Sequence, residues 1–598
     1  MNFLVLSETG LATAKRLQEK LGGVIYGRLK NGNHSDVRAV DSISDALRDL
    51  FAKGEPVVAL CAAGIVIRHL VPVLTSKYTD APVVSVSETG SAIVPLIGGH
   101  HGANDLSRQI GDILEVTPAI TTASDSFFKV ALDHPPMGWK LTNPENNKKF
   151  VAALRDGASV QIDGDADWLR DSNLPISDDG ELKITISDTI MTGDDQHLVY
   201  HRKNLALGVG CERNAEASEL ISLITDTLDA QNLSPFSLAG LFSIDLKMDE
   251  NAVHATAEHF NIPARFFDVE ALQAQESRLA NPSDIVKAEI GVAGVSEASA
   301  LAAGGELIVE KHKSKRATCA ITRADNIIDP KALGTARGHL AVVGIGPGRA
   351  DWRTGAAENA VRRADVIVGY HLYLNLIEDL IMDKEQHGYD LGKEEDRVRA
   401  AIDLAATGKN VALVSSGDAG VYAMGALAHE LLDRDGAPAS WDRITLELTP
   451  GVSAMQAAAL RVGAPLGHDF CAISLSDLLT PREVILQRVE AAAAGDFVIS
   501  FYNPVSKKRR DLLAIARDTL LQHRPDNTPV VLARNLGRPT EEITILELKD
   551  LQVDDVDMLT LVMVGSSETR ARKRGDGSWS VFTPRGYAAK HTPLKKEA

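Results

Sequence analysis

The feature that most constrains the fold is an apolar run at residues 340–343 followed directly by the turn Gly-Ile-Gly-Pro-Gly at residues 344–348. A short apolar run that ends in glycine and proline is typical of a strand and its loop in an α/β domain. The loop does not match a dinucleotide-binding motif, because Arg349 stands where the third glycine would be. It also lacks the Gly-Lys-Ser/Thr ending of a P-loop. The sequence therefore predicts an α/β domain that begins near residue 338, with a loop that suits neither NAD nor ATP.

Length and charge narrow the class of protein. The chain has 598 residues, enough for about three to five domains of ordinary size. Its hydrophobic content of 44% and charged content of 24% are typical of globular proteins in water. The net charge of −18 argues against a broad nucleic-acid surface, because phosphate binding requires a basic stripe. We interpret the basic runs at residues 570–574 and 595–596 as solvated turns and tail.

The cysteines and the N-terminus favour a cytoplasmic protein. Cys61, Cys211, Cys319 and Cys471 lie far apart, and none forms a Cys-x-x-Cys pair. This spacing suggests neither a zinc site nor a disulfide framework, and the 17 histidines show no metal-ligand spacing. Residues 1–6 lack the basic region and the length of a signal peptide. No stretch approaches the roughly 20 apolar residues that span a membrane.

Strand-like and helix-like segments alternate along most of the chain, which predicts a multidomain α/β protein. Residues 57–60 and 83–86 have the pattern of buried strands of a parallel sheet, and 102–114 that of a helix. Composition then shifts toward Asp, Asn and Pro, and a new strand begins near residue 205. We expect an α/β domain at 1–130, a small middle region at 131–200, a further α/β domain at 201–324, a linker at 325–337 and a second half from 338.

Turn-forming residues recur at the carboxyl ends of the predicted strands of the second half. They follow strands that end at Val414, Leu448, Phe501 and Leu532. In open α/β sheets, ligands bind in the crevice outside these strand ends, where glycines let the backbone approach a ligand closely. Each turn alone is most often only a turn, but their ordered succession predicts a ligand site.

That succession resembles the cobalamin-pathway tetrapyrrole methyltransferases, which use S-adenosylmethionine. In detail it is similar to the precorrin-3B C-17 methyltransferases, which contract the macrocycle. The motifs that carry the resemblance are Val-Gly-Tyr at 368–370 with Tyr373, Ser-Gly-Asp-Ala-Gly-Val-Tyr-Ala-Met at 416–424, Pro-Gly-Val-Ser-Ala at 450–454, Ser-Leu-Ser-Asp-Leu-Leu-Thr-Pro at 474–481 and Tyr-Asn-Pro at 502–504. The resemblance implies a two-subdomain tetrapyrrole methylase fold, at about 338–446 and 447–590, with the cofactor between the subdomains. It also implies a homodimer formed through this half.

The resemblance further implies which residues form the site. The S-adenosylmethionine site would include Gly417, Asp418, Val421, Ser453, Ala454, Asn535 and Thr560. The tetrapyrrole substrate would meet Gly346, Pro347, Gly348, Tyr502 and Asn503. Ring contraction requires proton movement, for which Asp418 and Asp477 are the candidates. The alternative for both carboxylates is helix capping or loop hydrogen bonding. No protein-bound metal is expected, because any cobalt would arrive inside the substrate.

Segments of the N-terminal half resemble the cobalt-precorrin-5A hydrolases, which open a lactone and release acetaldehyde. They lie at residues 61–68, 95–106, 121–125, 208–213, 243–247 and 291–298. His100 and His101 follow a strand and two glycines, so one of them would activate water while loop amides bind the developing oxyanion. The alternative is that both are turn histidines with ordinary hydrogen bonds. We interpret Cys211 as a structural residue rather than a nucleophile, since free cysteines usually behave as small hydrophobic residues.

The two resemblances together predict a bifunctional enzyme of cobalamin biosynthesis. The C-terminal half would methylate precorrin-3B at carbon 17 and contract the ring to give precorrin-4, and the N-terminal half would have a hydrolase-like activity. One alternative makes the N-terminal half a non-catalytic tetrapyrrole-binding module. Another keeps the methyltransferase but moves the methyl group to a different precorrin carbon. The expected partner is a precorrin, without nucleic acid or membrane.

Overall fold

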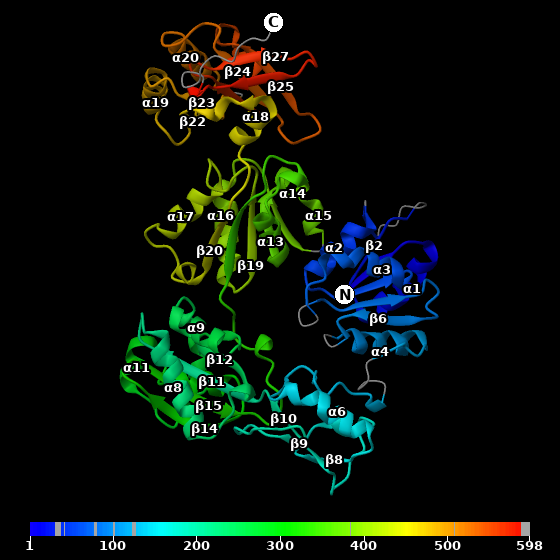
Figure 1. The fold of residues 1–598 in the computed structure, drawn as a ribbon. Helices are drawn as coiled ribbons and strands as arrows, with labels where there is room; N and C mark the ends of the chain where they lie inside the picture. The colour runs from blue at the N-terminus through cyan, green and yellow to red at the C-terminus, as the bar shows by residue number, and fades with distance from the viewer. Residues whose placement is uncertain are drawn as a thin grey trace. The chain divides into compact units, whose positions relative to one another are not determined.

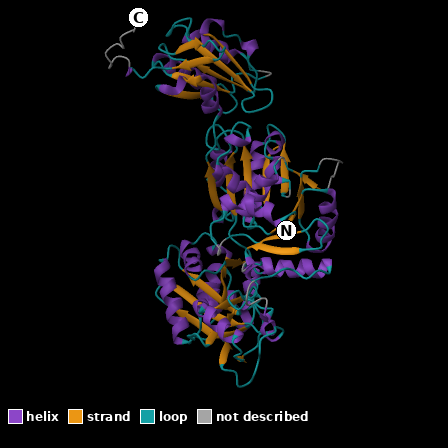
Figure 2. Ribbon diagram, turned by 45° about the vertical axis from the view of Figure 1, so that its right-hand side comes forward, coloured by secondary structure: helices purple, strands orange, loops and turns teal. Residues whose placement is uncertain are grey.

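The computed structural model describes residues 1–29, 37–40, 42–76, 80–99, 102–121, 127–382, 384–506 and 509–587 (Figure 1). The chain forms two compact units. The first comprises Met1–Phe242, Ala252–Pro263 and Glu270–Leu333, and the second Ser243–Asn251, Ala264–Val269 and Gly334–Ala598. Each unit contains sheets with helices packed against them (Figure 2), so the predicted multidomain α/β class is confirmed.

The first unit begins with a six-stranded sheet of order β3-β2-β1-β4-β5-β6. Its strands are β1 (Asn2–Val5), β2 (Val24–Gly27), β3 (Val37–Ala39), β4 (Val57–Leu60), β5 (Val83–Val86) and β6 (Ile93–Ile97). The helices are α1 (Glu8–Leu21), α2 (Ile43–Ala52), α3 (Ala63–Leu70) and α4 (Ala103–Leu114). The first and fourth pack on one face and the second and third on the other. The strands are parallel except β6, which runs antiparallel to β5, so the expectation of a purely parallel sheet is wrong at this edge.

Two more sheets follow. The four-stranded sheet has the order β7-β10-β9-β8, with β7 (Trp139–Leu141), β8 (Val160–Asp163), β9 (Leu182–Ile186) and β10 (His197–Arg202). Helix α6 (Asn147–Arg155) covers its core. The five-stranded sheet has the order β13-β12-β11-β15-β14, with β11 (Leu205–Cys211), β12 (Leu238–Ile244), β13 (Ala264–Phe267), β14 (Glu306–Lys313) and β15 (Ala317–Arg323). Helices α8 (Ala217–Ala230), α9 (Asn251–His259) and α12 (Val295–Ala302) belong to the same region.

The second unit opens with a fully parallel sheet of order β18-β17-β19-β16-β20. Its strands are β16 (His339–Gly344), β17 (Val366–Tyr370), β18 (Glu385–Tyr389), β19 (Asn410–Ser415) and β20 (Thr445–Thr449). Helices α16 (Glu394–Ala406) and α17 (Met424–Leu432) cover one face, and α13 (Gly355–Arg363), α14 (His371–Asn375) and α15 (Glu378–Ile381) the other. Burial on both faces explains the continuous apolar runs that marked these strands in the sequence.

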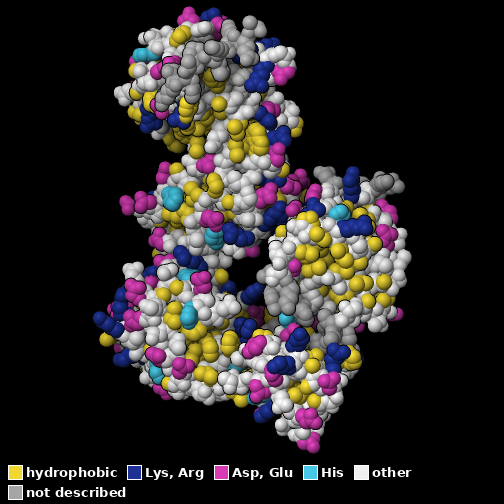
Figure 3. Space-filling view, in the orientation of Figure 1, with side chains coloured by type: hydrophobic (Ala, Val, Ile, Leu, Met, Phe, Trp, Pro, Cys, Tyr) yellow, Lys and Arg dark blue, Asp and Glu magenta, His cyan; other side chains and the backbone are white. Residues whose placement is uncertain are grey.

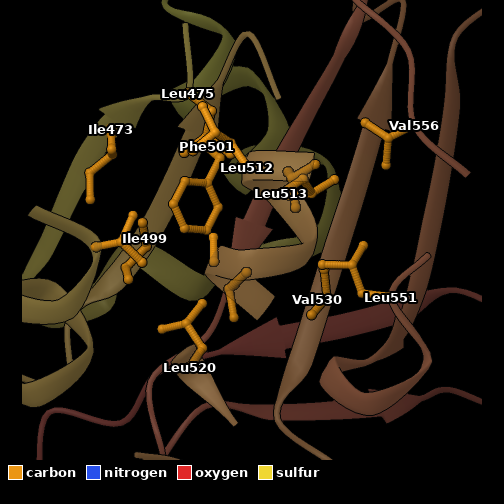
Figure 4. Close-up of a cluster of buried hydrophobic side chains, with 14 of the residues drawn as sticks. Ile473, Leu475, Ile499, Phe501, Leu512, Leu513, Leu520, Val530, Leu551 and Val556 are labelled. Carbon is orange, nitrogen blue, oxygen red and sulfur yellow. The ribbon is translucent and has the colours of Figure 1, made fainter. Parts of the chain in front are cut away.

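A mixed sheet of order β22-β23-β26-β24-β25 completes the second unit. The strands are β22 (Phe470–Ser474), β23 (Val498–Tyr502), β24 (Pro529–Arg534), β25 (Glu542–Glu547) and β26 (Thr560–Val564). Helices α19 (Arg482–Ala494) and α20 (Asp511–Leu520) close over one face around the buried Phe501 (Figure 4). Helix α18 (Ala454–Val462) packs on the other face.

A small third sheet of this unit joins β21 (Gly463–Ala464), β28 (Trp579–Phe582) and β27 (Arg570–Lys573). The basic run is therefore an exposed strand and not the turn that the sequence suggested, because its backbone pairs with β28. On the face seen in Figure 3, acidic and basic side chains are interspersed. All four cysteines are free thiols. Among the described residues no helix is long and apolar enough to cross a membrane.

Candidate active site

A cavity of about 210 Å³ lies at the carboxyl ends of strands in the second unit. All seven residues predicted for the cofactor line it, together with three of the five predicted for the substrate. They are Gly417, Asp418, Val421, Ser453, Ala454, Asn535 and Thr560, and Pro347, Tyr502 and Asn503. The loops after β16, β19, β20, β23 and β24 supply most of these residues, as the rule for open α/β sheets requires.

Close backbone packing shapes one wall of the cavity. Gly346 and Gly417 exchange two backbone hydrogen bonds, at 3.0 and 2.8 Å. Both have a positive φ, at 73° and 75°, a conformation that glycine adopts without strain. A Cβ atom on Gly451 would lie only 2.1 Å from the Gly417 carbonyl oxygen. Three loops therefore meet through their backbones, and no side chain would fit between them.

Asp418 ties two of these loops together. Its Oδ1 accepts a hydrogen bond from the Gly420 amide at 2.8 Å, and its Oδ2 accepts one from the Gly451 amide at 3.0 Å. Both carboxylate oxygens are thus engaged with backbone donors, which is the arrangement of a residue that fixes the loop after β19 against the loop after β20.

The start of α18 forms the next part of the wall. Ser453 is 3% exposed and caps the helix: its hydroxyl accepts from the Gln456 amide, and the Gln456 side chain accepts from the Ser453 amide. The Tyr502 hydroxyl accepts a hydrogen bond from the Met455 amide at 3.1 Å. Tyr422 packs against Tyr502 with ring centroids 5.1 Å apart. The cavity wall here combines aromatic surface with backbone polar groups.

Burial dominates the electrostatics of these phenols. It raises the pKa of Tyr502 above its ordinary value of 10.0, although the hydrogen bond from Met455 acts in the opposite direction. Burial likewise raises the pKa of Tyr373, which also lines the cavity. Both phenols therefore stay protonated near neutral pH, where they can donate hydrogen bonds but do not serve as bases.

Asn535 and Thr560 sit on the opposite side of the cavity. The Asn535 amide donates to the Leu559 carbonyl at 3.2 Å, and its side chain donates to Thr540 at 3.1 Å. Asn535 has a positive φ of 49°, which asparagine tolerates better than most residues. The Thr560 hydroxyl donates to Asp557 at 2.8 Å. These bonds hold the end of β24 beside the start of β26.

Some predicted residues lie elsewhere. Gly346 and Gly348 shape the adjoining loop but are not among the residues that line the cavity. Asp477 is also outside the lining, and it forms an ion pair with Arg509 at 2.9 Å. His100 and His101 lie outside the residues that the structure describes.

Several lining residues were given no role by the sequence, among them the polar side chains of Tyr373, Tyr422 and Arg538. The two tyrosines stand within or beside the quoted motifs, so the signal was present. Arg538 comes four residues after the end of β24 and had no motif to mark it. Its Nε atom is buried and has no hydrogen-bond partner among the described residues.

The distinctive residues of the N-terminal half are chiefly structural where the structure describes them. Cys61 is buried at the end of β4, and burial, with a contribution from Glu88, raises the pKa of its thiol to about 11. Glu297 is 1% exposed and accepts hydrogen bonds from three backbone amides and the Asn281 side chain. A thiol that stays protonated and a carboxylate that is fully engaged are poor candidates for nucleophile and base. Across the described residues, no three histidine, cysteine or acidic side chains are grouped as metal ligands.

Comparison with known proteins defines the class of both halves. Residues 339–552 match the family of tetrapyrrole (corrin/porphyrin) methylases. Residues 45–125 and 205–322 match the N-terminal and C-terminal families of cobalamin synthesis protein G.

The chain shares 45% identity over 251 residues with the precorrin-3B C(17)-methyltransferase of Sinorhizobium sp, which covers 42% of this chain and 98% of that protein. It shares 41% identity over 259 residues with the cobalt-factor III methyltransferase of Priestia megaterium, 43% of this chain and 46% of that protein. The crystal structure of the methyltransferase CobJ aligns with 39% identity and a TM-score of 0.38, over 41% of this chain and 100% of that one. The chain belongs to the tetrapyrrole methylase family through its C-terminal half, and its N-terminal half carries cobalamin synthesis G domains. The predicted resemblances are confirmed.

Proposed function

We propose that the C-terminal half transfers a methyl group from S-adenosylmethionine to carbon 17 of precorrin-3B, or of its cobalt-bearing counterpart, with contraction of the ring to the precorrin-4 level. The observation that carries this proposal is the single cavity around which all seven predicted cofactor residues gather. The identity of 45% to a precorrin-3B C(17)-methyltransferase supports a precorrin as the substrate.

The residues around the cavity suit this cofactor. The cofactor supplies a sulfonium methyl group, which is a strong electrophile without further activation. In this proposal, backbone groups near Gly417 and Val421 hold its methionine and ribose parts, and Ser453, Ala454, Asn535 and Thr560 its adenosine. The support is that all of these residues line the one cavity. The aromatic wall of Tyr422 and Tyr502 offers apolar surface at the same edge. We infer that S-adenosylmethionine binds here.

The contribution of the protein is then mainly alignment. Loops fixed by the Gly346–Gly417 backbone pair and by the Asp418 carboxylate would hold the two reactants at a constant distance. Alignment of this kind can lower a barrier by roughly 7–11 kcal/mol in the best intramolecular models. We assign Asp418 to positioning, because both of its oxygens already accept hydrogen bonds. The raised pKa of Tyr373 and Tyr502 keeps both phenols protonated near neutral pH, so they can donate hydrogen bonds but do not remove a proton.

The test uses the whole chain. It is incubated with precorrin-3B and, in a parallel sample, with cobalt-factor III, each with methyl-labelled S-adenosylmethionine. A single added methyl group with the absorbance change of ring contraction, in either sample, is the expected result. No transfer to either macrocycle would overturn the assignment. A methyl group at another carbon, located by NMR, would favour the alternative acceptor position.

We further propose that the N-terminal half opens the lactone of cobalt-precorrin-5A with release of acetaldehyde, on the strength of its two cobalamin synthesis G domains. The full-length chain and its His100→Ala and His101→Ala variants are mixed with this substrate, and acetaldehyde is measured enzymatically. Release by the wild type and its loss in one variant is the expected result. Binding of the macrocycle without release would instead make this half a binding module.

Two simpler proposals accompany these. We infer that the enzyme is a homodimer through the methyltransferase half, which light scattering on the purified chain tests directly.

We also infer that it works in a reducing compartment such as the cytoplasm, since its four thiols are free.

A further inference from the structure

Arg397 of the second unit is a buried cation that forms no ion pair within 4.0 Å among the described residues. It lies in the first turn of α16 and is 4% exposed. Its Nη2 contacts the Met424 sulfur at 3.5 Å, which is a weak acceptor. Its Nε and Nη1 have no hydrogen-bond partner among the described residues. A buried guanidinium stays charged, so its lost hydration is left uncompensated.

In another buried arginine of the same unit, an ion pair compensates for the lost hydration of the guanidinium. The Arg353 side chain is 5% exposed and makes a two-pronged ion pair with Asp379, at 2.9 and 2.7 Å. The neighbours of Arg397 are instead the phenols Tyr370, Tyr373 and Tyr389, with Glu394 as the acidic group that acts on it. Burial lowers the pKa of Arg397 despite Glu394, as expected for a cation held away from water.

Arg538 belongs to the other subdomain and reaches the same tyrosine. It lines the cavity, and its Nε is likewise buried without a partner among the described residues. Its aliphatic stem crosses Gly348, where a Cβ atom would lie 3.1 Å from Arg538 Cγ. Both Arg538 and Arg397 act electrostatically on Tyr373, and they offset part of the rise in pKa that burial produces. Tyr373 also lines the cavity, as Arg538 does, whereas Arg397 lies outside the lining and acts on this wall only through its charge.

We propose that Arg538 and Arg397 form a receptor for a carboxylate group of the ligand that fills this cavity. Arg538 lines the cavity and contacts the carboxylate directly, and Arg397 adds positive potential from outside the lining. This inference rests on the proposed function, in which both reactants carry carboxylates: the methionine part of the cofactor and the acid side chains of the macrocycle. A guanidinium with free N–H groups is the side chain best suited to such an anion. In the complex, the positive charge of Arg397 would attract the bound carboxylate.

The test compares charged with neutral ligands on full-length variants. Arg538→Gln and Arg397→Met are made with the conservative variants Arg538→Lys and Arg397→Lys. The control is Arg363→Gln, which removes an exposed guanidinium paired with Glu447 at 3.4 Å. S-adenosylhomocysteine is titrated against 5′-methylthioadenosine, which lacks the carboxylate. The precorrin-3B macrocycle is titrated against its methyl ester, and circular dichroism and thermal unfolding confirm folding.

We expect Arg538→Gln to weaken one charged ligand by about 10- to 100-fold, the usual value of a hydrogen bond to a charged group, and to leave its neutral counterpart unchanged. Loss restricted to S-adenosylhomocysteine identifies the cofactor carboxylate, and loss restricted to the macrocycle identifies a substrate side chain. The lysine variants should recover part of the affinity. If the affinity for the charged and the neutral ligand falls equally, or if neither affinity changes, the proposed carboxylate receptor is wrong. A wild-type chain that binds neither reactant would overturn the proposed function itself.

Discussion

Each half of the chain has a Gly-x-Gly segment on or at the end of an inner strand, and the glycines of the two segments make room for different neighbours. In β11 of the N-terminal half, a Cβ atom on Gly208 would lie 1.9 Å from the Ser296 carbonyl oxygen and 2.6 Å from the Ala300 nitrogen. Glycine there lets α12 lie directly on the sheet. At the end of β16, a Cβ atom on Gly344 would meet the Gly417 carbonyl at 2.7 Å. Glycine there lets a loop, rather than a helix, approach the strand.

The carboxylates of the two halves differ in the same way. Glu297 is buried and its hydrogen bonds close the interior of the N-terminal half around it. Asp418 uses the same kind of partner, the backbone amide, but it lies on the wall of an open cavity. The comparison teaches that a glycine-rich or acidic motif indicates a ligand site only when it stands at a strand end that faces a cavity.

The largest expected effect comes from Gly451→Ala. The added Cβ would lie 2.1 Å from the Gly417 carbonyl and 2.7 Å from the Gly344 carbonyl. Backbone atoms cannot rotate away, so the loops after β16, β19 and β20 must separate. A misplacement of about 1 Å in an aligned site costs roughly 100-fold, and kcat/KM for methyl transfer should fall by about that factor. Gly355→Ala is the control, because nothing lies within 4 Å of its added Cβ. Activity within about threefold of the wild type would contradict this account of the loops.

Gly208→Ala should act on stability and leave methyl transfer intact. Overpacking of this kind costs typically about 1–3 kcal/mol, and here the clash is with helix backbone. Hydrogen exchange should show faster opening of β11 and α12, while methyl transfer by the full chain stays at the wild-type level. Gly64→Ala, with open space around its Cβ, is the matched control in the same half. Unchanged exchange rates would mean that α12 adjusts without cost.

Glu297→Gln should destabilise the same region by about 1–3 kcal/mol, since an amide cannot accept all the hydrogen bonds that the carboxylate accepts. Burial alone would raise the pKa of Glu297, but the hydrogen bonds that its carboxylate accepts have the larger effect and lower this pKa below its ordinary value of 4.5. This stabilisation is therefore present above the unfolded pKa and is lost as the pH falls through the folded one. The free energy of unfolding should be measured between about pH 7 and about pH 3. The values for the wild type and the variant should converge at the acid end of this range. A constant difference across this range would contradict the assignment.

Much of the fold followed from local patterns. The segments at 57–60 and 83–86 coincide with β4 and β5, because buried parallel strands are continuous apolar runs between turns. The strand predicted to begin near residue 205 is β11, and the strand predicted to end at Val414 is β19, which extends one residue further. The strand predicted before the glycines at 98–99 is β6, but its antiparallel direction was missed, because pairing direction has no local signature. The small sheet of β21, β27 and β28 was missed as well, because a two-residue strand such as β21 leaves no pattern in the sequence.

The site divides in the same manner. Residues at strand ends, such as Gly417 and Ser453, were accessible to sequence reasoning because parallel strands share one carboxyl edge, and the family resemblance then assigned them. Arg538 and Arg397 were not, since only the tertiary structure brings these two charges within electrostatic reach of Tyr373. The sequence pattern can thus predict the strands and loops that form the cavity. The charged side chains that act on it can be identified only from the tertiary structure.

The smallest effect, and the sharpest test of the cavity wall, is expected for Tyr502→Phe. The variant loses the acceptor for the Met455 amide at 3.1 Å and keeps the ring that packs against Tyr422. One hydrogen bond of this kind is worth about 1 kcal/mol, so KM for S-adenosylmethionine should rise about fivefold with little change in kcat. Because burial keeps the pKa of Tyr502 above 10.0, the ratio to wild type should stay constant from about pH 6 to about pH 9. Tyr26→Phe removes a buried phenol from β2 in the other half and should leave methyl transfer unchanged. A ratio for Tyr502→Phe that varies with pH would show that this phenol titrates during the reaction, and would move Tyr502 from the wall of the site into its proton chemistry.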